Sequence, residues 1–165
     1  MYLNQKDIFW GINKAFVKEI MNIAITETQK KGTVLFQEGD LANQFYILLK
    51  GRVKLRLGQI GQSVYMVSSA GEAFGWSSLT GRDTYSASAE CLSETKLLKI
   101  EKDPLQKAIE KDPSNGLILF RRLAELLGDR LIQTYTLLSS AYRAESSSSF
   151  GTGQVVSTTV TEHEK

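Results

Sequence analysis

Residues 45–57 read Phe45-Tyr46-Ile47-Leu48-Leu49-Lys50-Gly51-Arg52-Val53-Lys54-Leu55-Arg56-Leu57. An apolar run, 45–49, and a run with an apolar residue at every second position, 53–57, are separated by a short turn that contains Gly51. The second run alternates apolar and basic residues strictly, which is typical of a strand with one buried and one wet face. The stretch therefore predicts two successive strands joined by a tight turn.

The same character extends in both directions, over about residues 32–100. Further strands are predicted at 33–36, 64–67, 85–89 and 96–100. Glycines separate these short apolar runs, at positions 32, 39, 51, 58, 61, 71, 75 and 81. The Gly58-Gln59-Ile60-Gly61 stretch is predicted to be a hairpin loop. Many short strands with glycine turns and no long helix between them indicate a sandwich or barrel.

Helical periodicity flanks this region on both sides. Apolar residues recur in steps of three and four within 7–28, which predicts one or two short amphipathic helices with Asp7 as a cap. Asp103-Pro104 is predicted to open a short helix, with Asp103 as the cap and proline in the first turn. Asp112-Pro113 opens a longer helix, over about 114–142.

The long helix carries a heptad pattern. Apolar or small residues recur in alternating steps of four and three, at Phe120, Ala124, Leu127, Leu131, Thr134, Leu138 and Ala141. Three such heptads usually face another helix, often a copy of the same one. The pattern predicts a dimer helix and a homodimer. Residues 1–143 are predicted to form one domain, and the composition of residues 144–165 predicts a flexible Ser-rich tail.

Composition excludes several classes of protein. The chain has 165 residues, with 20 Lys and Arg against 18 Asp and Glu and a net charge of +2, so nothing at whole-chain level demands nucleic acid or an anionic membrane. It has one cysteine, Cys91, and one histidine, His163. These counts argue against a disulfide framework, a Ser-His-Asp or Cys-His enzyme and a histidine-ligated metal centre. We expect a cytoplasmic protein with no metal, no membrane span and no enzyme activity, in which Cys91 is buried and inert.

Three motifs in order carry a resemblance to a known family. They are Lys31-Gly32-Thr33-Val34-Leu35-Phe36-Gln37-Glu38-Gly39-Asp40, the stretch Phe45–Val53, and Gly71-Glu72-Ala73-Phe74-Gly75 through Ser86-Ala87. Over roughly residues 7–143, the chain resembles the cyclic-nucleotide-binding domain of the catabolite-activator and fumarate-nitrate-reduction (Crp/Fnr) regulator superfamily. The resemblance implies an eight-stranded double-stranded β-helix (jelly roll) flanked by helices and followed by a long dimerisation helix.

The resemblance also implies a ligand site in a short helical cassette. In the family, amides of that helix cradle the cyclic phosphate, a Glu directly after the second Gly binds the ribose, and an Arg before Ser-Ala or Thr-Ala pairs with the phosphate. Here Trp76 and Tyr85 stand at those two positions. The residues implied for the site are Gly71, Glu72, Phe74, Gly75, Trp76, Ser77, Ser78, Arg82, Tyr85, Ser86 and Ala87.

Loss of both determinants predicts weak binding of cyclic AMP, since truncating one partner of a buried charge pair costs about 2–5 kcal/mol. Two alternatives stay open. Trp76 and Tyr85 either fill the pocket and make it inert, or line it for a flatter aromatic ligand with the Tyr85 hydroxyl as a polar handle. Arg82 is a candidate substitute cation. Glu72 is interpreted first as a structural carboxylate.

The resemblance favours a regulatory domain that senses a small-molecule or cyclic-nucleotide-like effector and signals through its helix pair, without a bound cofactor. The alternatives are a degenerate, ligand-free scaffold or dimerisation module, and the sensor half of a truncated transcription factor. No winged helix-turn-helix pattern follows the long helix, so this chain is not expected to bind specific DNA. A protein partner would then carry the output.

Overall fold

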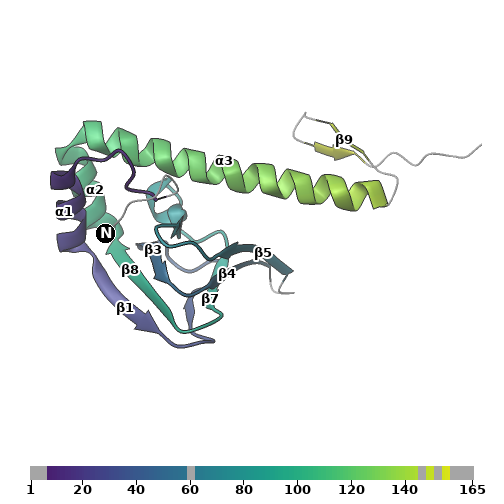
Figure 1. The fold of residues 1–165 in the computed structure, drawn as a ribbon, viewed down its shortest axis with the longest axis horizontal. Helices are drawn as coiled ribbons and strands as arrows, with labels where there is room; N and C mark the ends of the chain where they lie inside the picture. The colour runs from purple at the N-terminus through teal and green to yellow at the C-terminus, as the bar shows by residue number, and fades with distance from the viewer. Residues whose placement is uncertain (1–6, 59–61, 145–147, 151–153, 157–165) are drawn as a thin grey trace, which may run out of the picture. The chain divides into compact units, whose positions relative to one another are not determined.

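The computed structural model describes residues 7–58, 62–144, 148–150 and 154–156. It divides into two compact units, the first ending at Ala124 and the second beginning at Glu125. The first unit contains the β structure and its flanking helices (Figure 1). Each unit is described by itself below.

Eight strands of the first unit form two four-stranded antiparallel sheets. Sheet A has the order β1 (Ile25–Gln29), β8 (Thr95–Glu101), β3 (Gln44–Lys50), β6 (Ala73–Phe74). Sheet B has the order β2 (Val34–Phe36), β7 (Ser88–Cys91), β4 (Val53–Leu57), β5 (Gln62–Val67). The non-consecutive neighbours in both sheets are those of a jelly roll, which confirms the predicted fold class.

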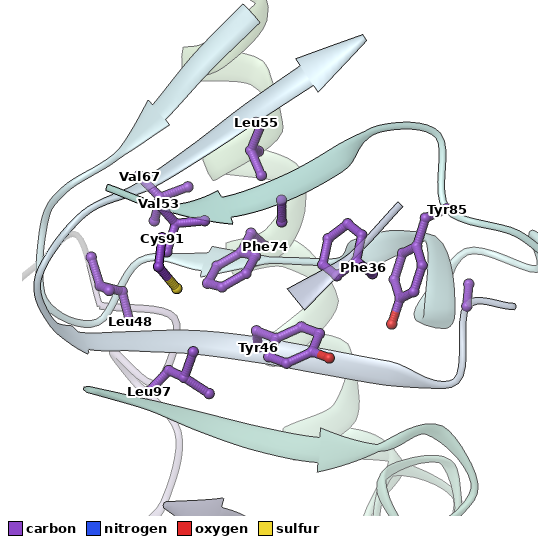
Figure 2. Close-up of a cluster of buried hydrophobic side chains, with 12 residues drawn as sticks. Phe36, Tyr46, Leu48, Val53, Leu55, Val67, Phe74, Tyr85, Cys91 and Leu97 are labelled. Carbon is purple, nitrogen blue, oxygen red and sulfur yellow. The ribbon is translucent and has the colours of Figure 1, made fainter. Parts of the chain in front are cut away.

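The interior of the roll lies between the two sheets. On β4, Val53 and Leu55 are buried while Lys54 and Arg56 are half-buried, as the alternation predicted. Both sheets contribute to the core cluster, which consists of Phe36, Ala42, Tyr46, Leu48, Val53, Leu55, Val67, Phe74, Tyr85, Ala89, Cys91 and Leu97 (Figure 2). Apolar side chains from seven strands, together with the loop residues Ala42 and Tyr85, thus close the interior of the roll.

A second buried layer lies on the other side of sheet A. Phe45, Ile47, Leu98 and Ile100 alternate with the roll-facing residues of β3 and β8 and are also buried. On this side α1 (Lys14–Ile23) and α2 (Lys102–Lys111) contact each other and β8. The helices supply Phe16, Ile20, Leu105 and Ala108 to this layer, which is why the sequence there shows the helical period.

The segment 7–28 differs from its prediction. Asn13, not Asp7, caps α1, because its Oδ1 accepts a hydrogen bond from the Phe16 amide at 2.8 Å. Asp7 is buried and accepts from the Phe9 amide at 3.0 Å, within a turn. Residues 25–29 form β1 because Ile25, Thr26 and Thr28 are β-branched and pair with β8.

Two other boundaries are also corrected. The predicted strand 85–89 begins only at Ser88, because Tyr85 lies in a loop with its ring turned into the core. Asp103 does not cap α2: the cap position is Glu101, without a side-chain bond, and Asp103 lies in the first turn. The strand β8 runs directly into the helix, and the Lys102 amide donates to the Asn43 carbonyl instead.

The long helix α3 (Pro113–Ala144) begins where predicted. Asp112 Oδ1 accepts from the Asn115 amide at 3.1 Å at this start. Within the second unit, Leu131, Tyr135 and Leu138 are exposed and fall on one face by their spacing. Thr134 donates its hydroxyl to the Arg130 carbonyl, and the Ala141 side chain lies outside the described residues.

Two short strands pair antiparallel in the segment predicted to be a flexible tail. They are β9 (Ser148–Phe150) and β10 (Gln154–Val156). The rest of that segment beyond Ala144, and residues 59–61 of the predicted hairpin loop, lie outside the described residues.

Candidate functional site: the cassette between β6 and β7

The cassette begins at a turn that requires glycine. Gly71 has φ +85°, and a Cβ built there would lie 2.8 Å from Asp7 Cγ. Next to it, Glu72 accepts from the Tyr65 hydroxyl at 2.7 Å and from the Ser68 and Ser69 amides at 3.2 Å each. The Glu72 carboxylate therefore holds the turn after β5, in agreement with its interpretation as a structural group.

Gly75 positions the short helix of the cassette. It has φ +72°, and an added Cβ would lie 3.0 Å from Tyr46 Cδ2 and 3.2 Å from the Gln44 carbonyl oxygen. The 3₁₀-helix η1 (Trp76–Leu79) follows directly. Phe74, immediately before Gly75, pairs with Tyr46 across β6 and β3 and is fully buried. The cassette is thus anchored in the core by the residues on which the family motif depends.

Tyr85 stands where the resemblance described above predicts a phosphate-binding arginine. It is buried, and its ring stacks on Phe36 with a centroid separation of 3.8 Å and an interplanar angle of 16°. Its hydroxyl donates to the Gln44 carbonyl at 2.7 Å and accepts from the Gln44 amide at 3.1 Å. Figure 2 shows the ring beside Phe36, within the buried cluster. Both the ring and the hydroxyl of Tyr85 are therefore engaged within the fold.

Trp76 and Arg82 lie together at the outside of the cassette. Trp76 is half-buried, and the Arg82 guanidinium carbon lies 6.0 Å from the centroid of its ring. This is the distance range of a cation–π contact. Arg82 is exposed, so its charge stays near water rather than in the roll.

The serines of the cassette form a small polar group. The Ser77 and Ser86 hydroxyl oxygens are 3.5 Å apart, and the Ser86 amide donates to Ser77 Oγ at 3.4 Å. Ser78 is buried and donates to the Gly75 carbonyl at 2.9 Å. Ala87, which follows Ser86, is half-buried. The serines thus join the short helix to the chain that returns toward β7.

Gln44 is the site residue that sequence reasoning missed. Besides its two backbone bonds with Tyr85, its side-chain Oε1 accepts from the Tyr46 hydroxyl at 2.5 Å. Burial raises the pKa of Tyr46 and of Tyr85, so both hydroxyls remain protonated donors at neutral pH. The Gln44 contacts with Tyr85 use backbone atoms, which every residue has. The identity of the residue at position 44 therefore could not predict these contacts.

The cassette consequently lacks a buried cation. Its charged residues over 71–87 are Glu72, Arg82 and Asp83, of which Glu72 holds a turn and the other two are exposed. Among the described residues, no three His, Cys, Asp or Glu side chains gather as metal ligands. The chemistry available is that of backbone groups, hydroxyls and aromatic rings.

The comparisons with known proteins assign the family. The family model described as "Cyclic nucleotide-binding domain" matches residues 26–112, which is more than half of the chain. The chain belongs to this family. A cyclic AMP receptor protein of Thermus thermophilus is 29% identical over 119 residues, which are 68% of this chain and 53% of that protein. A protein of Rhodopseudomonas palustris that bears the name of a potassium channel is 25% identical over 107 residues, 65% of this chain and 26% of its own length.

Solved structures agree with the fold. The catabolite activator protein of Thermus thermophilus superposes with a TM-score of 0.64 at 27% identity, covering 79% of this chain and 61% of that one. A cyclic nucleotide-binding domain from Methylobacillus flagellatus superposes with a TM-score of 0.69 at 23% identity, over 78% of this chain and 73% of that one, and shows the fold alone. The chain spans about a quarter and about half of the two curated relatives.

The same comparisons bear on activity. The relatives named above are regulators, binding domains and a channel rather than enzymes. In the part of the chain that the structure describes, no helix is long and apolar enough to cross a membrane.

Proposed function

We propose that this chain is a regulatory domain that keeps the cyclic-nucleotide-binding fold but does not hold cyclic AMP or cyclic GMP tightly. One observation carries the proposal: Tyr85, at the position of the phosphate-binding arginine, is buried against Phe36 and bonded in both directions to the Gln44 backbone. A side chain so engaged cannot turn toward a phosphate without breaking two hydrogen bonds and a ring contact.

The electrostatic balance supports the same conclusion. A cyclic phosphate carries a negative charge, and removing one partner of a buried charge pair costs about 2–5 kcal/mol. Arg82, the cation of the cassette, is exposed, with its guanidinium carbon 6.0 Å from the centroid of the Trp76 ring. Backbone amides and the Ser77 and Ser86 hydroxyls then remain as donors, without a charge to strengthen them.

The test is a calorimetric titration of the intact chain with cyclic AMP and cyclic GMP. We expect no binding heat at millimolar nucleotide. The double variant Trp76→Glu/Tyr85→Arg returns both family determinants and is expected to gain tenfold or more in affinity. Tyr85→Phe is the matched control, since it frees the Gln44 backbone without adding a charge, and it is expected to gain nothing.

Micromolar binding by the unaltered chain would overturn the proposal. Because Tyr85→Arg disturbs the core, each variant is first checked by its urea midpoint and near-ultraviolet circular dichroism. If the double variant unfolds, the single variant Trp76→Glu, at a half-buried position, serves in its place, with a smaller expected gain.

The output side of the proposal is the second unit. On α3, the exposed residues Leu131, Tyr135 and Leu138 share one face, as the predicted heptad pattern requires for Leu131 and Leu138. We expect this face to pair two copies of the chain, so that a homodimer transmits the regulatory state. The domain is expected to have no enzyme activity and to act in the cytoplasm through a protein partner.

A second candidate function is favoured by Trp76. It is half-buried and carries Arg82 over its ring, an arrangement that suits a flat, anionic ligand other than a cyclic nucleotide. Trp10→Phe leaves Trp76 as the only tryptophan of the chain. A fluorescence screen of planar carboxylates with that variant would detect such a ligand, and a uniformly silent screen counts against this candidate.

A further inference from the structure

Three turns meet at one end of the roll. They are residues 30–32, 50–52 and 92–95, which connect β1 to β2, β3 to β4, and β7 to β8. The Gly32 amide donates to the Cys91 carbonyl at 2.7 Å, and the Leu92 amide donates to the Arg52 carbonyl at 2.9 Å. A Cβ on Gly51 would lie 2.6 Å from the Glu94 carbonyl oxygen. The three turns are therefore packed against one another.

This end of the roll is strongly basic. Its exposed cations are Lys30, Lys31, Lys50, Arg52 and, one residue into β8, Lys96, a set called the basic end from here on. Glu94 is the one carboxylate in the same segments. Among the described residues, no member of the basic end lies within 4.0 Å of a carboxylate.

Three other cations of the roll, Lys54, Arg56 and Lys99, have carboxylate partners. Glu90 lies 3.6 Å from both Lys54 and Arg56, and Glu27 pairs with Lys99. The contrast shows that, of the clustered cations of the roll, those of the basic end are left without such partners.

Two lysines of the basic end directly oppose each other. Lys50 of β3 and Lys96 of β8 are partners in the antiparallel register. Like charges in directly opposite positions destabilise a sheet. A bound anion would relieve this repulsion, so the arrangement favours occupation by a negative group.

The basic end continues into an open strand edge. β1 is the edge strand of sheet A, and Thr28 of β1 is the register partner of Lys96. Ile25, Thr26 and Thr28 are exposed, and Figure 1 shows β8 on one side of β1 and no other strand of the first unit beyond it. The unpaired backbone groups of an edge strand accept a further extended chain.

We propose that the basic end and the free edge of β1 together form a docking surface for an acidic, extended segment of a partner protein. The segment adds to β1 as a further strand, and the acidic residues that continue past the Gln29 end of β1 lie across the basic end, against Lys30, Lys31, Lys50 and Lys96. Main-chain hydrogen bonds supply affinity and the lysines supply the preference for acidic side chains.

The composition of the surface favours a peptide over the other anionic partners. Segments 30–32, 50–52 and 92–96 contain no aromatic residue on which bases could stack, as single-stranded nucleic acid would require. They also present no exposed large apolar side chain for insertion into a membrane. Four of the five cations are lysines, point charges without the bidentate fork that favours arginine at phosphates.

The test uses a fluorescein-labelled decapeptide of alternating glutamate and threonine, titrated with the intact chain and followed by anisotropy. We expect binding that weakens with salt and falls tenfold or more in Lys50→Glu/Lys96→Glu. That variant keeps two like charges opposite each other, so the cross-strand repulsion is unchanged. The matched control is Lys14→Glu/Lys18→Glu, two exposed positions on α1, which is expected to bind as the unaltered chain does.

Hydrogen exchange locates the peptide. Amides within residues 24–31 are expected to exchange more slowly when the peptide is bound. The proposal fails if a decapeptide of alternating glutamine and threonine binds equally well, if both double variants bind alike, or if exchange in 24–31 does not change. It also fails for the partner class if oligothymidylate or phosphatidylserine vesicles bind the same lysines more tightly than the peptide. Should Lys50→Glu/Lys96→Glu not fold, Lys50→Gln/Lys96→Gln replaces it, with a smaller expected loss.

Discussion

The ring of Tyr85 lies nearly parallel to that of Phe36, with centroids 3.8 Å apart. Phe36 belongs to β2, and Tyr85 lies in the loop that returns the cassette toward β7. Such a pair contributes about 0.5–1.5 kcal/mol beyond the area that it buries. The contact therefore fixes the end of the cassette to sheet B, while the Tyr85 hydroxyl fixes it to Gln44 of sheet A.

Removing this hydroxyl should destabilise the roll. Tyr85→Phe leaves the Gln44 amide and carbonyl without their shared partner, and we expect the free energy of unfolding to fall by about 1–2 kcal/mol. Urea denaturation measures the change. Tyr135→Phe, at an exposed position of α3, is expected to stay within about 0.5 kcal/mol of the unaltered chain. Equal values for the two variants would show that the Gln44 bonds contribute nothing.

Two glycines of the cassette separate backbone strain from packing. Gly75 and Gly81 have φ of +72° and +73°, but only Gly75 has neighbours within 4 Å of an added Cβ. Gly81→Ala should cost about 1–2 kcal/mol, the penalty of the left-handed conformation. Gly75→Ala should cost more than that, because Tyr46 and the Gln44 carbonyl must move. Thermal or urea unfolding compares them, and a larger loss in Gly81→Ala would contradict the packing argument.

The helix of the second unit allows a paired test of self-association. Leu131 is 49% exposed and Leu137 is 68% exposed, but the two side chains lie roughly 120° apart around the helix. Leu131→Glu places a charge on the face shared with Leu138 and is expected to shift sedimentation equilibrium from dimer to monomer. Leu137→Glu is expected to leave the dimer intact. A monomeric unaltered chain at high micromolar concentration would refute the heptad interpretation.

Asp7 should make stability depend on pH. Burial, partly offset by the Phe9 amide, raises its pKa above 3.8 in the folded chain. A raised folded-state pKa means that the proton stabilises the fold, so this contribution is complete below pH 3.8 and is lost as pH rises through the raised value.

The comparison variant for this effect is Asp7→Asn, whose side-chain oxygen still accepts from the Phe9 amide. The unaltered chain should gain stability relative to Asp7→Asn as pH falls from neutral into the acid range, in urea titrations at each pH. A difference that stays constant with pH would show that Asp7 titrates normally.

Sequence alone predicted most of the fold where the pattern is local. The strand Val53–Leu57 was predicted with its observed bounds because strict alternation fixes both its period and its buried face. Residues 25–28 fell within the stretch 7–28 predicted to be helical, because Ile23 and Ala24 continue the helical period up to them. Pairing with β8 makes residues 25–29 a strand. Asp7 failed as a cap because its side chain serves a buried turn instead.

Sequence predicted which residues form the candidate site, but not how their side chains are packed. The substitutions at Trp76 and Tyr85 are visible in the sequence, as is the structural role of Glu72. Whether those aromatics fill the site or line it depends on neighbours far along the chain. The structure separates them: Tyr85 is committed to Phe36 and Gln44, while Trp76 is half-buried beneath Arg82.

Cys91 is the single cysteine of the chain and is wholly buried in the roll. Burial raises the pKa of its thiol, so it reacts slowly with maleimides while the protein is folded. An introduced, exposed cysteine can therefore be labelled selectively without first replacing Cys91. A cysteine placed at exposed Leu137, off the face that Leu131 shares with Leu138, would take a spin label by itself, and the distance between two labels would measure how far apart the helices of a pair lie.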